Sequence, residues 1–235
     1  MAIAQYLAMT AAEMIGSTSL PQKAAWMACH FSPYSTGLCN LPSALPPGSL
    51  LILNDRTPLH GHDVNRVCQE LTQAIEQFSC FGLLVDFQNK PTDESLQLTA
   101  YLATHLQYPL GLPPAYAVKN AAVFIPATPT LTRLSCYLAP WKGQEIWLED
   151  ALEGESAILT KGGTSIRANP GPQDGIIHAD RNLHCHYTIQ ARQNSILFHT
   201  WRTNSDLEAL LEDAEQEGVT LSVGLYQELY CPPKV

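Results

Sequence analysis

The sequence predicts a single α/β domain over residues 1–235, most simply a (β/α)8-type, or TIM-like, barrel. Residues 49–107 read strand, helix, strand, helix, an order that requires parallel strands joined by crossover helices. The length of 235 residues suits one large core and one small barrel. Hairpin patterns interrupt the second half and fewer than eight strand–helix units are evident. We therefore expect a barrel that is irregular or shortened there, with β-hairpin insertions.

The composition is that of a globular protein, with 46% hydrophobic and 15% charged residues. A formal net charge of −9 argues against a partner of nucleic acid, which requires a basic face. The absence of 18 uninterrupted apolar residues predicts no membrane span. Residues 1–16 lack the basic start of a secretory signal, so we expect a cytoplasmic location.

Neither a metal nor a cofactor is expected. The seven cysteines are odd in number and lack the spacing of zinc ligands, which indicates buried, reduced thiols. His60 and His62 follow Asp55 closely, but nothing in the pattern supplies a third ligand. Phosphate-binding and dinucleotide-binding glycine motifs are missing as well.

The first half begins with a short helix, which we expect over residues 2–15 and ended by Gly16. Residues 24–31 then read as the first core strand. Proline and glycine mark 33–49 as a loop, and loops of such length are often functional. The apolar run at 49–56 predicts a second strand with a polar exit.

The clearest unit follows. Apolar residues recur at helical spacing over 63–78, with Asp63 as a credible N-cap. The apolar run at 81–88 predicts a strand that is buried on both faces. A second helical pattern runs from about residue 92 to residue 107.

The second half is less regular. Its expected elements are strands at 116–118 and 121–126, a helix at 130–138, a strand at 144–150, hairpins over 156–168 and 184–202, a helix at 205–217 and a strand at 219–226.

Polar side chains gather where the strands are predicted to end. Asp86 and Gln88 share one face of the strand 81–88, and Asn89 follows them. Ligands bind at the carboxyl ends of parallel strands. Candidate ligand-binding residues near such ends are His30, Tyr34, Asp55, Asn89, Trp201, Tyr226 and Glu228.

The unit from Asp63 to Leu106 resembles the fourth-strand region of the glycoside hydrolase family 18 chitinases. Their motif, D-G-x-D-x-D-x-E, falls on residues 81–88, where Gly82 and Asp86 match. Phe81 and Leu84 replace the first two aspartates, and Gln88 stands at the acid position. The C-terminal helix and strand and the strand at 146–150 are similar in layout, so the resemblance covers roughly half the chain.

In that family the motif glutamate protonates the leaving oxygen, while an aspartate helps to position the acetamido group of the substrate. Gln88 has no such proton, so the resemblance implies a catalytically degenerate barrel that binds a glycan or a small polar ligand. Two alternatives stay open: an active hydrolase with a relocated carboxylate pair, and a structural or interaction barrel with a vestigial pocket. The candidate catalytic residues are Asp86, Gln88, Glu149 and Asp150.

Overall fold

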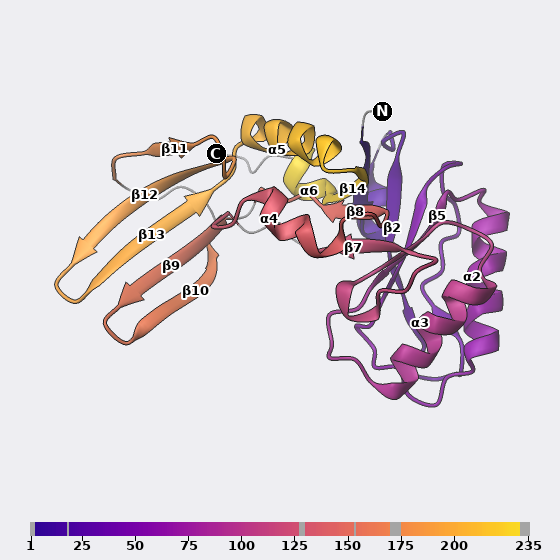
Figure 1. Ribbon diagram of the computed structural model, residues 1–235. Helices are drawn as coiled ribbons and strands as arrows, with labels where there is room; N and C mark the ends of the chain where they lie inside the picture. Colours follow the sequence, from indigo (N-terminus) through magenta and orange to yellow (C-terminus); the bar gives the residue numbers. More distant parts are fainter. Residues whose placement is uncertain (1–2, 18, 127–129, 153, 170–174, 231–235) are drawn as a thin grey trace.

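The computed structural model describes residues 3–17, 19–126, 130–152, 154–169 and 175–230. Eight parallel strands form a closed barrel (Figure 1), in which β1 pairs with both β14 and β2. This confirms the predicted barrel, and the barrel is not shortened. Its strands are β1 (Ala4–Met9), β2 (Ala24–Phe31), β4 (Leu50–Asn54), β5 (Gly82–Asp86), β6 (Leu110–Leu112), β7 (Ala122–Ile125), β8 (Ile146–Glu149) and β14 (Val219–Leu225).

The barrel is irregular, as predicted, because the helices outside it differ widely in length. They are α1 (Ala11–Gly16), α2 (Val64–Gln77), α3 (Asp93–His105), α4 (Leu134–Leu138), α5 (Asn204–Gln216) and α6 (Tyr226–Leu229), with 3-10 turns η1 (Pro114–Tyr116) and η2 (Ala139–Trp141). Figure 1 shows α2 and α3 side by side on one flank of the barrel. No helix among the described residues is long and apolar enough to cross a membrane.

Three apolar clusters form the core. One fills the barrel interior and includes Leu84, Phe124 and Trp147. The others lie between the strands and the outer helices, under α2 and α3 and under α4 and α5. Gly111 in β6 has a packing role, because a Cβ there would lie 2.3 Å from the ring of Trp147. The missing side chain leaves room for the indole in the barrel interior.

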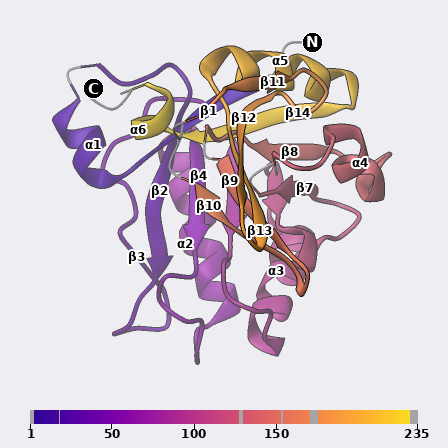
Figure 2. The same cartoon turned by 90° about the vertical axis from the view of Figure 1, so that its left-hand side faces the viewer.

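A second sheet is inserted between β8 and α5 and projects away from the barrel (Figures 1 and 2). It is antiparallel and contains β9 (Gly154–Thr160), β10 (Gly163–Asn169), β11 (His178–Asp180), β12 (Cys185–Arg192) and β13 (Ser195–Trp201). His184 Nε2 lies 2.7 Å from Asp213 Oδ2, and His186 Nδ1 lies 2.7 Å from Asp206 Oδ2, so two His–carboxylate pairs connect this inserted sheet to α5. Both predicted hairpins are present.

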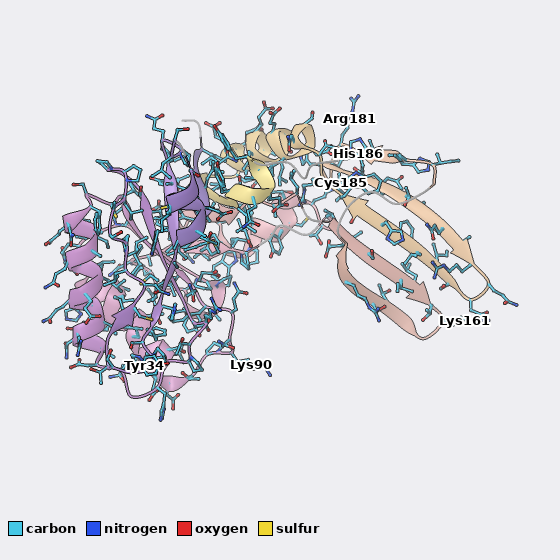
Figure 3. All side chains as sticks on the ribbon, turned by 180° about the vertical axis from the view of Figure 1, so that it is seen from behind. Tyr34, Lys90, Lys161, Arg181, Cys185 and His186 are labelled. Atoms are coloured by element: carbon cyan, nitrogen blue, oxygen red, sulfur yellow. The ribbon has the colours of Figure 1, made fainter. Side chains whose placement is uncertain are left out.

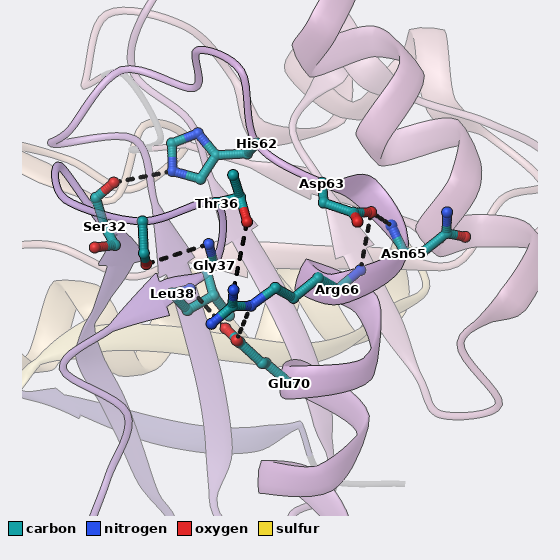
Figure 4. Close-up of polar contacts among 10 residues, drawn as sticks. Ser32, Thr36, Gly37, Leu38, His62, Asp63, Asn65, Arg66 and Glu70 are labelled. Carbon is teal, nitrogen blue, oxygen red and sulfur yellow. Dashed lines mark hydrogen bonds and ion pairs between the residues drawn. The ribbon is translucent and has the colours of Figure 1, made fainter.

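The long loop after β2 is fastened to the start of α2 (Figure 4). Glu70 accepts hydrogen bonds from Leu38 N at 2.6 Å and from Arg66 Nε at 2.8 Å. His62 Nε2 donates to the carbonyl of Ser32 at 3.0 Å. The loop contains the short strand β3 (Leu38–Cys39), which pairs antiparallel with β2. These contacts hold one wall of the barrel mouth in a defined position.

We expect the Asp63→Ala variant to lose about 1 kcal/mol of unfolding free energy. Asp63 Oδ1 accepts from the backbone N–H groups of Asn65 and Arg66, at 2.9 and 3.2 Å. Alanine would leave both donors to water. Urea denaturation measures the difference, and Asp63→Asn, which keeps an acceptor oxygen, should recover most of it. A loss for Asp63→Asn as large as that for Asp63→Ala would contradict the capping role.

Two predicted elements were wrong and one strand was missed. The helix predicted over 2–15 is, from residue 4 on, the strand β1 followed by the short helix α1, because β1 pairs with β14 and β2 and closes the barrel. The missed strand is β6, which lies between the predicted helical pattern that ends near residue 107 and the strand predicted at 116–118. The strand predicted at 116–118 is not present, and residues 114–116 form a 3-10 turn instead. For β1 and β6, pairing with strands distant in the sequence outweighed the local signal.

Candidate functional site

A cavity of about 730 Å³ opens at the carboxyl ends of the barrel strands. Its floor is apolar and consists of interior side chains, among them Ile52, Leu84, Phe124 and Val223. Its walls carry polar groups from the strand ends and the loops that follow: Thr10, His30, Asn40, Asn54, Asp55, Arg56, Asp86, Gln88, Asn89 and Glu149. A concave apolar site with convergent polar groups is the usual form of a small-molecule site.

Asp86 and Gln88 line the cavity together, from the end of the fourth barrel strand. Gln88 Nε2 donates to Asp86 Oδ1 at 2.5 Å. Burial raises the pKa of Asp86, and the nearby Asp55 carboxylate raises it further, while the hydrogen bond from Gln88 opposes both effects. Asp86 is therefore a carboxylate whose charge is poorly stabilised by its surroundings.

Asp55 is a buried residue that positions the loop after β5. Its Oδ1 accepts from Gln88 N and its Oδ2 from Asn89 N, both at 2.9 Å. Asn89 Nδ2 returns a hydrogen bond to the carbonyl of Asp55 at 3.0 Å. Two backbone donors on one carboxylate fix the direction in which Gln88 enters the cavity.

His30 lies at the rim of the cavity, among polar neighbours. Its Nε2 is 3.0 Å from Asn40 Nδ2, and its Nδ1 is 2.9 Å from the Phe31 carbonyl oxygen and 3.2 Å from Cys39 Sγ. Cys39 is opposite His30 in the β2–β3 pairing. Burial raises the pKa of the Cys39 thiol. The ring of His30 is thus held in place by β3 and by the residue that follows it.

Glu149 and Asp150 are consecutive in sequence but lie on opposite sides of the barrel wall. Glu149 lines the cavity. Asp150 is buried on the outer side, where its Oδ2 accepts from Gln5 Nε2 at 2.5 Å. Desolvation raises the pKa of Asp150 to about 6. Side chains alternate across a strand, so only one carboxylate of the two can face a ligand in the cavity.

Four other sequence-predicted residues lie outside the cavity lining. Tyr34 is 96% exposed on the loop after β2 (Figure 3), and Trp201 is buried in the inserted sheet against the ring of His186. Tyr226, the first residue of α6, stacks on Tyr230, which follows the helix. Glu228 accepts a hydrogen bond from Leu152 N. The structure does not bring these four side chains to Asp86.

The sequence reading missed Thr10 and Asn40 as wall residues. Thr10 follows β1, so recognising that strand would have revealed it. Asn40 adopts a positive φ of 54° in the loop after β3, and no local pattern marks it as a cavity residue. Among the described residues, no group of three or more His, Cys, Asp or Glu side chains could hold a metal ion.

No protein-family model matches the chain, and no curated protein matches its sequence. Solved structures do match its fold. The chitinase-like agglutinin RobpsCRA from Robinia pseudoacacia has a TM-score of 0.60 at 10% identity, with 93% of each chain covered. The spore cortex-lytic enzyme SleL from Bacillus cereus has a TM-score of 0.57 at 10% identity, with 95% of this chain and 70% of the other covered.

A mutant GH18 chitinase from Cycas revoluta, in complex with (GlcNAc)4, has a TM-score of 0.52 at 10% identity, with 94% of each chain covered. At identities this low, the structural similarity establishes the fold but not the activity. The strand that carries Asp86 is the fourth strand of the barrel, as the motif comparison predicts. This chain therefore has the barrel fold of the glycoside hydrolase family 18 chitinases and their chitinase-like relatives.

Proposed function

We propose that this barrel binds a glycan in the cavity at its mouth without hydrolysing it. The observation that carries the proposal is the pairing of Gln88 with Asp86 inside the cavity. A carboxamide has no proton to give to a leaving oxygen. It can still donate and accept hydrogen bonds from a sugar hydroxyl or an amide.

The shape and the lining of the cavity support the same function. A volume of about 730 Å³ is within the range of pockets that bury small ligands. The apolar floor suits the C–H face of a sugar ring, while Asn54, Gln88 and Asn89 offer amide groups around it. Structural neighbours with an agglutinin name and with bound (GlcNAc)4 are consistent with a carbohydrate ligand.

Calorimetric titration with (GlcNAc)4 tests this proposal, together with analysis of the products after long incubation. We expect binding with no cleavage. The Asp86→Ala variant should bind at least about tenfold more weakly, because a hydrogen bond to a charged group contributes roughly 1.5–3 kcal/mol. Glu212→Ala, at an exposed position on α5, serves as the matched control. Absence of binding across a panel of chito-oligosaccharides would favour the vestigial pocket instead.

One observation favours a second candidate, an active hydrolase. Asp86 and Glu149 line the same cavity from different strands, and burial raises the pKa of Asp86, as a proton donor requires. In that case wild-type protein would release shorter sugars, and Asp86→Asn and Glu149→Gln would each abolish the release. Activity that arises only in Gln88→Glu would instead support the degenerate barrel, since it restores an acid at the motif position.

A further inference from the structure

The cavity at the barrel mouth carries an excess of negative charge. Among the described residues, its lining includes the carboxylates of Asp55, Asp86 and Glu149 but a single guanidinium, that of Arg56. Asp55 accepts hydrogen bonds from the backbone N–H groups of Gln88 and Asn89, so its carboxylate is engaged within the loop. Of the other two carboxylates in the lining, Asp86 lies beside Gln88 at the end of β5.

Among the described residues, no cationic side chain forms an ion pair with Asp86. In the part of the chain that the structure describes, its one side-chain donor is the neutral amide of Gln88. The carboxylate of Asp55 lies close enough to raise the pKa of Asp86, and burial raises it more. A positive charge placed beside Asp86 would offset both penalties more strongly than a neutral hydroxyl or acetamido group.

The rest of the cavity limits the kind of cation. An apolar floor of Leu84, Phe124 and Val223 disfavours a fully hydrated ion and suits a ligand with an extended C–H surface. The amides of Gln88 and Asn89 next to Asp86 suit hydroxyl groups near the charge. An amine on a hydroxylated ring has all three features.

We infer that the ligand of this cavity is an amino sugar with a free, protonated amine, such as a glucosamine oligomer, whose ammonium group pairs with Asp86. This inference rests on the proposed glycan binding and specifies its substrate class. A protonated amine provides three N–H donors, and Glu149 supplies a second negative charge in the same cavity. Replacement of the amine by an acetamido group removes the charge and adds bulk at the same position.

Paired titrations with (GlcN)4 and (GlcNAc)4 at about pH 6, where ordinary carboxylates are ionised, test the inference. We expect wild-type protein to bind (GlcN)4 at least about tenfold more tightly. Asp86→Asn should reduce that preference to about twofold or less, because asparagine keeps hydrogen-bonding groups but has no charge to pair with the ammonium group. Circular dichroism and thermal melting verify that the variant is folded.

The net charge of −9 attracts any polycation, so the comparison needs a charge control. Glu212→Gln removes one negative charge from an exposed position on α5, outside the cavity lining, and should keep the full preference. Tetralysine, which has the charge without the ring, should not displace (GlcN)4.

The outcomes separate the two proposals. Equal or tighter binding of (GlcNAc)4 would overturn the amino-sugar inference and leave glycan binding intact. A preference that persists in Asp86→Asn, or that Glu212→Gln or tetralysine abolishes, would also overturn it. If neither oligosaccharide binds, the proposed function fails and the inference fails with it.

Discussion

Replacing Trp147 by alanine is expected to lower the free energy of unfolding by about 3–5 kcal/mol. The indole is 1% exposed and fills the barrel interior between Leu84 and Phe124 and beside Gly111. Its Nε1 donates to Glu145 Oε1 at 3.0 Å, so truncation also leaves that oxygen without its indole donor. The neighbouring strands cannot collapse into the space without breaking the closed sheet. Urea unfolding followed by circular dichroism measures the loss.

A matched apolar substitution on the inserted sheet serves as the control. Leu159 is 37% exposed in β9, and Leu159→Ala should change stability by about 0.5 kcal/mol or less. Trp147→Phe should recover part of the loss, because an aromatic ring still occupies the interior. A loss below about 1 kcal/mol for Trp147→Ala would mean that the interior is not packed around this indole.

Asp150→Asn should make the protein more stable above pH 6 and remove the pH dependence that this carboxyl group contributes. Desolvation raises the pKa of Asp150 from 3.8 to about 6 in the folded protein. The unfolded chain therefore loses this proton first as the pH rises, so this group lowers stability progressively between about pH 4 and pH 6. Above pH 6 the cost levels off at about 3 kcal/mol.

An asparagine at position 150 has no charge to desolvate, and its oxygen can still accept from Gln5 Nε2. Thermal melting of both proteins from pH 4 to pH 8 tests the expectation: the curves should diverge as the pH rises. Glu212→Gln, at an exposed position, should follow the wild-type profile. Parallel profiles for wild type and Asp150→Asn would show that burial does not perturb this carboxyl group.

Parts of the fold with strong local signals were predictable from the sequence. The unit β4–α2–β5–α3 combines apolar strands with an amphipathic helix capped by Asp63. β1 was not predictable, because Ala4–Met9 has mixed propensity and becomes a strand through its pairing with β2 and β14. β6 has three residues, one of them Gly111, whose missing side chain makes room for Trp147 far along the chain.

The candidate site divides in the same way. Asp86 and Gln88 could be placed on one face because strand periodicity is local. The separation of Glu149 from Asp150 follows from the same alternation once the register of β8 is known. The positions of Tyr34 and Trp201 depend on how a loop and an inserted sheet pack, which tertiary contacts decide. The placement of aromatic residues near strand ends therefore could not be derived from local sequence patterns.

The inserted sheet leaves the barrel and returns to it at nearly one point. Arg202 N donates to the carbonyl of Leu152 at 3.3 Å, so the outgoing and incoming chains meet beside the end of β8. The barrel strands make their pairings without it, since the two sheets share no strand. The inserted sheet thus has adjacent ends, and the strand register around the barrel mouth is set by pairings in which it takes no part.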